Sequence, residues 1–443
     1  MQRYRILGFA AALGTAVSLT ARAGSPTDLT FRLVHERRFQ LDGAIPLSAD
    51  VFWPGAQYTA EVAALPAELS FATVSGEVKF RYSFQAGNKR LPEPPFEAAL
   101  LPAGRFPVAV FVKKGDVVRL LETVPLPDGF DPRDAVYTRT LRFHAEGGAV
   151  RPCAALSAGI GQADIRFVTE GRENRPYEEA GRFFFTFSAR AYGSWLGVMS
   201  VDPRNPADLR LEGAIFFSTG DGIVRNDHAA DLFHDPETRM WRAYVSNFST
   251  SNDKLGHRAK GGVNAAWSKE APLRGVHVMQ AKTLDLPGMN EDSDGIWDAE
   301  AGRWRMLLSE FTPKKGIRAS MWESAAWDGP FTKIAGPVEF NSTGTTILPY
   351  EGKRYCLSGS SDRAVYVFSY PGLETVGRLS FDTPPWPATG KGGPHGRVWP
   401  AIAPFREGGR TVWLMVTMDR ENFPGMPKPN WTYGKLMLYK GSR

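Results

Sequence analysis

Long apolar runs, basic clusters and cysteines are all scarce in this sequence of 443 residues. After the first 23 residues no segment is long and apolar enough to cross a bilayer as a helix, which takes about 20 residues, so we expect no membrane insertion. Lysine and arginine are spread along the chain without a cluster, and we expect no nucleic-acid partner. The formal net charge of +6 falls to +3 without Arg3, Arg5 and Arg22, which is a mild excess.

Cysteine and helical periodicity are also rare. Cys153 and Cys356 lie far apart, so an oxidising compartment would allow one disulfide, and two buried free thiols are the alternative. Almost no stretch repeats apolar residues at helical spacing. Instead, 45 glycines and 33 prolines separate short alternating runs of β-branched and aromatic residues, which predicts an all-β protein.

The first 23 residues have the pattern of a secretory signal peptide. Arg3 and Arg5 precede an apolar run over residues 6–19, and Ala21-Arg22-Ala23 matches a small-residue cleavage site. We therefore predict that residues 1–23 are removed, that the mature chain starts near Gly24, and that the protein is secreted or periplasmic.

Residues 24–150 contain strand-like runs, such as residues 77–84, 105–114 and 138–145, separated by turns rich in proline and glycine. These runs predict an antiparallel β-sandwich. No cluster of carboxylates or histidines occurs in this region, so we expect an accessory domain rather than a catalytic one.

Residues 151–443 repeat a short pattern of a polar turn, an aromatic residue and an apolar strand. The positions three residues before each repeat segment are Glu173, Asp231, Asp294, Thr346 and Ala401. Their spacing of about 50 to 60 residues is typical of a propeller blade, and five units fit the available length. We therefore predict a five-bladed β-propeller as the catalytic domain, closed by residues 163–169 pairing with the last blade.

Acidic residues gather at the predicted starts of the innermost strands, beside the propeller axis. Carboxylates crowded in a partly dry pocket cannot all ionise, so at least one should have a raised pKa and form an acid beside a base. Hydrolysis of a glycosidic bond uses such a pair. The predicted catalytic residues are Glu173, Asp231, Glu291, Asp292 and Asp294.

Other residues from the same strand starts are predicted to bind the substrate: Arg175, Asp227, His228, His395, Arg397 and Trp399. Tryptophan can stack on a sugar ring, and arginine can bind a hydroxyl or a carboxylate. Structural alternatives stay open. Asp231 and Asp294 can fix strand ends, Glu173 can form a local ion pair with Arg175, and the histidines can be satisfied structural imidazoles.

The stretches NDHAADLFHDPETRMWRAYVS and EDSDGIWDAEAGRWRMLLSEF resemble the blade signature of five-bladed glycoside hydrolases. These are the arabinanase and xylosidase type, glycoside hydrolase family 43, and fold relatives that act on fructans, mannosides and anhydro-sugars. The resemblance covers about residues 172–440. It implies an aspartate base from blade one, an orienting aspartate from blade two and a glutamate acid from blade three.

Carried over to this sequence, the resemblance assigns the orienting role of blade two to Asp227 or Asp231. It assigns the acid role of blade three to Glu291, Asp292 or Asp294. Blade one departs from the family, because Glu173-Asn174-Arg175-Pro176 stands where the relatives have Asp-Pro. Some relatives hold a metal ion or an ordered water on the axis with a histidine, and Pro394-His395-Gly396 is similar to that element. An axial ion such as calcium is thus implied by the resemblance alone; the residues themselves predict no metal site and no cofactor.

We therefore expect an exported glycoside hydrolase acting on a plant or algal polysaccharide or oligosaccharide. One alternative is a carbohydrate-binding propeller without catalysis, which the departure in blade one favours. Another is a polysaccharide lyase that uses His395, Arg397 and a tyrosine such as Tyr192. The sequence leaves the sugar, the stereochemical outcome and the oligomeric state open.

Overall fold

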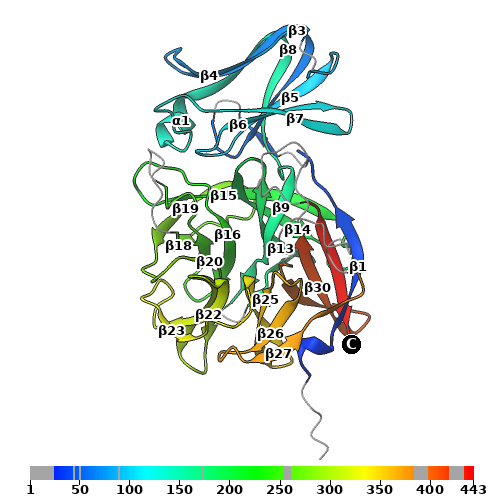
Figure 1. The fold of residues 1–443 in the computed structure, drawn as a ribbon, viewed down its shortest axis with the longest axis vertical. Coiled ribbons are helices and arrows are strands. Elements are labelled where there is room, and N and C mark those ends of the chain that lie inside the picture. The colour runs from blue at the N-terminus through cyan, green and yellow to red at the C-terminus, as the bar shows by residue number, and fades with distance from the viewer. Residues whose placement is uncertain are drawn as a thin grey trace, which may run out of the picture.

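The computed structural model describes residues 24–42, 45–48, 51–87, 90–171, 174–252, 261–383, 398–418 and 434–443. Strands dominate these ranges, and the only α-helix within them is the six-residue α1 (Ala135–Thr140) (Figure 1). The prediction of an all-β protein is confirmed. No helix in the described ranges has the length and apolar character needed to cross a membrane. The predicted signal peptide, residues 1–23, lies outside them.

Seven strands of the N-terminal region form one antiparallel sheet, in the order β2-β8-β3-β5-β6-β7 with β4 beside β3. Long β3 pairs with β5 through its first half and with β4 through its second, so a single strand serves both parts of a curled sheet (Figure 1). The two separate layers of a sandwich are not confirmed. The strands are β2 (Ile45–Leu47), β3 (Gln57–Thr73), β4 (Val78–Phe84), β5 (Phe96–Pro102), β6 (Val108–Lys114), β7 (Val117–Val124) and β8 (Leu141–Leu156).

The next strands follow one another in antiparallel groups of four. Group 1 contains β9 (Gly161–Phe167), β13 (Arg182–Arg190), β14 (Ser194–Val201) and β15 (Leu209–Ser218). Group 2 contains β16 (His228–Asp235), β17 (Met240–Ser246), β18 (Val263–Ser268) and β19 (Gly275–Thr283). Parallel pairing of β15 with β19 joins these groups into one sheet, which also includes β10 (Thr169–Glu170), β11 (Arg175–Pro176) and β12 (Glu178–Glu179).

Groups 3 and 4 are separate four-stranded sheets. Group 3 contains β20 (Asn290–Asp298), β21 (Arg303–Thr312), β22 (Gly316–Ser324) and β23 (Thr332–Ala335). Group 4 contains β24 (Thr343–Tyr350), β25 (Lys353–Gly359), β26 (Val365–Ser369) and β27 (Thr375–Arg378). Both have neighbouring strands in chain order, as hairpin connections produce.

Group 5 contains the first and the last described strands of the chain. Its order is β28-β1-β31-β30-β29, with β1 (Thr30–Arg37), β28 (Ser380–Phe381), β29 (Ala401–Glu407), β30 (Arg410–Met418) and β31 (Leu436–Ser442). Strand β1 pairs antiparallel with β31 from Thr30 opposite Ser442 to Arg37 opposite Leu436. The predicted closure by residues 163–169 is wrong, because β9 pairs with β13 in its own group. The strand that pairs with β31 instead comes from the region predicted to form the N-terminal domain.

The first strands of groups 1 to 4 share a β-bulge. Register shifts occur in β9, β16, β20 and β24, and one residue at each shift has positive φ: Asp164, Ala229, Asp292 and Gly344. An extra residue at a bulge changes which of the following side chains faces a given side. Two residues after each positive φ, the matching positions hold Arg166, Asp231, Asp294 and Thr346. Arg166 therefore occupies the group 1 position for which the sequence predicted Glu173.

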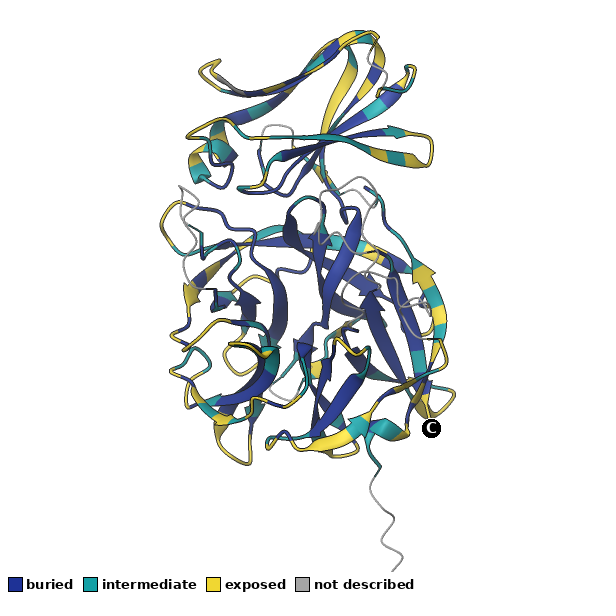
Figure 2. Ribbon diagram, viewed as in Figure 1, coloured by how far each residue is buried: buried dark blue, intermediate teal, exposed yellow. Residues whose placement is uncertain are grey.

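One apolar core runs from the N-terminal sheet into the groups below it (Figure 2). It includes Tyr58 and Phe71 of β3 together with Phe187 and Trp195 of group 1. Polar contacts reinforce this junction: buried Arg133 donates from Nη1 to the carbonyl oxygen of Ser249 at 2.9 Å. The N-terminal sheet thus packs against the end of the molecule where β16 begins.

Candidate active site

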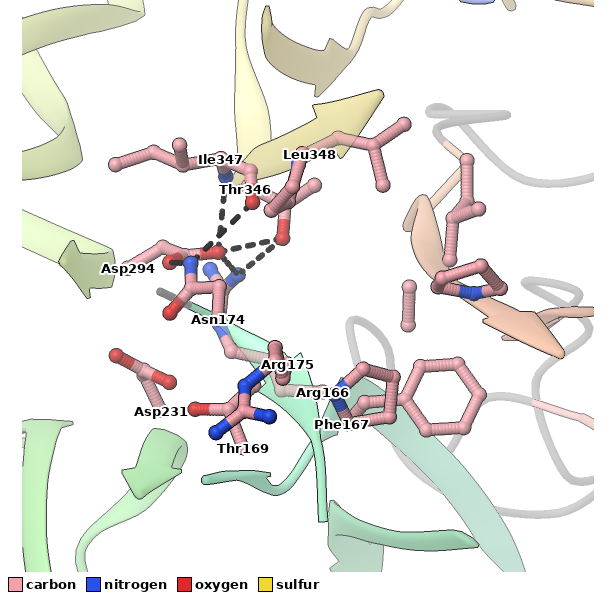
Figure 3. Close-up of a pocket in the computed structure, with 15 residues that line it drawn as sticks. Arg166, Phe167, Thr169, Asn174, Arg175, Asp231, Asp294, Thr346, Ile347 and Leu348 are labelled. Atoms are coloured by element: carbon pink, nitrogen blue, oxygen red, sulfur yellow. Dashed lines mark hydrogen bonds and ion pairs between the residues drawn. The ribbon is translucent and has the colours of Figure 1, made fainter. Parts of the chain in front are cut away.

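A cavity lies where one strand from each of the five groups converges (Figure 3). Its lining comes from β9, β16, β20, β24 and β29, and from the β10–β11 hairpin. About 600 Å³ of empty space is present, part of it open to solvent. Two of the predicted acids, Asp231 and Asp294, line this cavity together with Arg166, Asn174 and Arg175.

Asp231 has the properties of a carboxyl group that keeps its proton. Its side chain is buried, and Oδ2 accepts a hydrogen bond from the backbone N–H of Gly295 at 2.9 Å. The structure records no partner for its other oxygen among the described residues. Burial, followed by the negative charge of Asp294, raises the pKa of Asp231 well above the ordinary value.

Asp294 is held as the charged member of the pair. Its Oδ2 accepts hydrogen bonds from Thr346 Oγ1 at 2.5 Å and from the Ile347 N–H at 3.0 Å, and Oδ1 accepts one from Asn174 Nδ2 at 3.1 Å. Burial raises the pKa of Asp294, but Arg166 and these donors oppose the rise. The pair therefore shares one proton, and we place it on Asp231.

Arg166 ties three groups together across the cavity floor. From β9 its Nη1 lies 3.5 Å from Oδ2 of Asp294, and Nη2 donates to the carbonyl oxygen of Asp292 at 2.8 Å. Nη1 also donates to the carbonyl oxygen of Thr345 in β24. A buried guanidinium with these acceptors fixes the position and charge of Asp294.

Three other predicted residues bind parts of the protein and do not line this cavity. Both oxygens of Asp227 are engaged, and Oδ1 accepts from the N–H groups of Ser249 and Thr250 at 2.6 and 2.9 Å. Asp292 accepts from Thr343 Oγ1 at 2.8 Å. His228 is buried beside Ser194 Oγ, and burial lowers its pKa to about 3, so its ring is neutral.

The remaining predicted residues fall into two classes. The ring of Trp399 is buried against Gly344, 5.8 Å from the Arg166 guanidinium carbon, and half-buried Glu291 does not line the cavity either. Glu173, His395 and Arg397 lie outside the described residues.

Cys153 is exposed, Cys356 is buried, and both are free thiols, so the disulfide is absent.

The described residues do not fit the axial metal ion that the resemblance implies. Nowhere in the described ranges do three or more histidine, cysteine, aspartate or glutamate side chains come together to hold one. Oδ2 of Asp294 and Oδ2 of Asp292 already accept hydrogen bonds, and the Arg166 guanidinium lies beside Asp294. A cation at this point would meet a fixed positive charge.

Sequence reasoning missed two residues of the innermost strand of group 1, Asp164 and Arg166. Although burial raises the pKa of Asp164, the Arg190 guanidinium at 2.6 Å brings it below the ordinary range. Ala163-Asp164-Ile165 resembles Ala230-Asp231-Leu232 in sequence, but this match is two residues out of register, because Arg166 is the residue equivalent to Asp231.

No family model and no curated protein matches the chain in sequence. Among solved structures, it is similar to an α-L-arabinofuranosidase from Lactobacillus brevis, with 13% identity and a TM-score of 0.43, over 63% of this chain and 90% of that one. It is also similar to a family 117 glycoside hydrolase from Zobellia galactanivorans, with 11% identity and a TM-score of 0.40, over 63% and 84%.

A third similar structure is the catalytic domain of a family 62 α-L-arabinofuranosidase from Coprinopsis cinerea, with 12% identity and a TM-score of 0.40, over 64% of this chain and 91% of that one. The chain is thus similar in structure to glycoside hydrolases with a β-propeller-like fold. The resemblance found in the sequence has this structural counterpart.

The protonated state of Asp231 predicts how stability depends on pH. Its pKa is raised in the folded state, so between the ordinary carboxyl value and that raised value the folded chain binds a proton that the unfolded chain has lost. The free energy of unfolding should therefore fall as pH rises through this window, by at most about 1.4 kcal/mol per pH unit. Urea unfolding should find Asp231→Asn gaining stability relative to the original chain as pH rises above about 4. A constant difference across pH would contradict this assignment.

Proposed function

We propose that this protein is a glycoside hydrolase in which Asp231 protonates the leaving oxygen of a glycosidic bond. The observation that carries the proposal is the unequal carboxyl pair. Asp231 has a raised pKa and one oxygen without a partner among the described residues, and it lies beside a charged Asp294. Such a pair supplies an acid and a carboxylate at the same pH, which is what this hydrolysis requires.

Asp294 would act on the other half of the reaction. From the described residues its Oδ1 accepts only the hydrogen bond of Asn174, so it has room to accept one from a water molecule. As Asp231 gives its proton to the departing sugar oxygen, that water attacks the anomeric carbon and its proton passes to Asp294. The positive charge that develops on the sugar ring is stabilised by the same carboxylate.

The architecture we propose around this site is a five-bladed β-propeller made of groups 1 to 5, closed by β1 pairing with β31. The N-terminal sheet would be an accessory domain. We further propose that residues 1–23 direct the chain to the periplasm or the exterior, where plant or algal oligosaccharides and polysaccharides are the substrates. No nucleic-acid partner is proposed.

A second candidate is carbohydrate binding without catalysis. Arg166 stands at the group 1 position for which the resemblance implies an aspartate base, and it lies against Asp294. The lyase alternative gains no support from Tyr192, which packs on Phe106 with ring centroids 6.1 Å apart and does not line the cavity.

The test is incubation of the purified protein with a panel of plant and algal oligosaccharides and polysaccharides, with products identified by mass. We expect at least one to gain a water molecule and split at a glycosidic bond, and the Asp231→Asn variant to give no comparable product. Binding of a glycan by calorimetry without any product would favour the second candidate. A product with an unsaturated sugar would indicate a lyase.

A further inference from the structure

Arg175 brings a positive charge to the cavity that no described residue neutralises. It lies in β11, is exposed, and lines the cavity. Among the described residues, none forms an ion pair or a hydrogen bond with its guanidinium. Glu170, its neighbour across the β10–β11 hairpin, has its carboxylate 3.9 Å from Nδ1 of His234 instead. The cation of Arg175 is therefore available to a ligand.

The other charges of the cavity lining cancel. Arg166 is paired with Asp294, and Asp231 is neutral because it keeps its proton. Arg175 is then the uncompensated charge among the described lining residues, which together carry a positive charge. A neutral sugar would leave this charge without a counterion when it displaces water from the site.

Two features show where the exposed Arg175 guanidinium lies. A Cβ on Gly171 would lie 3.4 Å from Nη2 of Arg175, so the guanidinium passes beside a residue that has no side chain. Figure 3 shows the guanidinium on the Asp231 side of the cavity, apart from the hydrogen-bonded cluster around Asp294. An anion bound there would lie near the proton donor and away from the Asp294 carboxylate.

We infer that the cavity takes a sugar with an anionic substituent, a carboxylate or a sulfate ester, and that Arg175 binds this anion. The planar guanidinium can donate two parallel hydrogen bonds to either group. The inference rests on the proposed function, because it takes the cavity as the sugar site. It adds the substrate class: uronic acids or sulfated sugars in place of neutral ones.

The experiment measures binding, so it does not depend on turnover. The full chain is titrated by calorimetry with methyl glycosides of glucose and galactose, their uronic acid counterparts, and galactose 6-sulfate. At least one charged sugar should bind about 10- to 100-fold more tightly than its neutral counterpart, the range expected for a charge-assisted hydrogen bond. Whether the carboxylate or the sulfate is preferred identifies the source of the anion.

Arg175→Gln should remove this preference, and Arg175→Lys should keep part of it. The matched control is Arg410→Gln, which removes a charge from an exposed arginine that does not line the cavity and should keep the preference in full. Equal affinity for charged and neutral sugars, no binding of any charged sugar, or a preference that survives in Arg175→Gln would each overturn the inference.

Inorganic sulfate serves as the last control. If it binds as tightly as galactose 6-sulfate, the site recognises an anion and not a sugar, and the inference fails. The outcome for the proposed function is separate. A retained preference for charged sugars with no hydrolysis of any glycan would refute catalysis but leave the anion site standing. Hydrolysis of neutral glycans alone would support catalysis and refute the anion site.

Discussion

Replacing Asp231 by asparagine is expected to lower kcat on any hydrolysed glycan by about 10²- to 10⁴-fold, the usual contribution of a general acid. Asparagine has the shape of the protonated carboxyl group and can still accept the N–H of Gly295. It has no proton to give to the leaving oxygen. At about pH 4, where the carboxyl group is largely protonated in both states, the thermal transition should therefore remain close to that of the original chain. Turnover should be lost, as followed by product mass, and differential scanning calorimetry measures the transition.

Asp227→Asn is the matched control for this variant. Asp227 is also a buried aspartate and directly precedes β16, but its oxygens accept from Ser249, Thr250 and Asn264 and it does not line the cavity. An amide nitrogen would face one of these donors, so we expect a lowered melting temperature with kcat largely retained. If Asp231→Asn remains active while Asp227→Asn does not, the proton donor is assigned to the wrong residue.

Replacing Arg166 by methionine should cause the largest loss of stability among the cavity residues. Its guanidinium is buried and joins β9 to acceptors in groups 3 and 4, at Asp292, Asp294 and Thr345. Removal leaves the Asp294 carboxylate buried without its cation. Loss of one partner of a buried ion pair costs about 3 to 5 kcal/mol. Urea unfolding of the two chains measures this difference.

A double variant separates the charge effect from the loss of packing. Arg166→Met combined with Asp294→Asn removes the stranded charge, so it should be more stable than Arg166→Met alone. Arg303→Met, at an exposed arginine of β21, is the control and should change stability by less than about 0.5 kcal/mol. An Arg166→Met variant as stable as this control would show that the guanidinium contributes no net stability.

The repeat pattern of the sequence located the inner strands of groups 2 to 5 correctly. The predicted positions hold equivalent places, each opposite a residue of the neighbouring strand. The pairs are Asp231 with Tyr244, Asp294 with Leu307, Thr346 with Leu357, and Ala401 with Val416. Group 1 was missed because the β10–β11 hairpin lies between β9 and the turn that leads to β13. That insertion separates the acidic strand from the repeat segment which marks the other groups.

The choice among neighbouring acids could not be made from alternation. In a regular strand Asp292 and Asp294 would face the same side. The bulge at Asp292 breaks this rule, so Asp294 reaches the cavity and Asp292 binds residues 343 and 344 instead. Nothing local in the sequence marks a bulge at a non-glycine residue, because the positive φ is imposed by the neighbouring strands.

The pairing of β1 with β31 makes completion of group 5 a late event in folding. Residues 30–37 are synthesised early but find their partner only after residues 436–442 have been synthesised, about 400 residues later. Contacts of such long sequence separation form slowly. Until then, the nascent protein exposes an unpaired strand at each side of the gap, which is a surface that other chains can join by edge pairing.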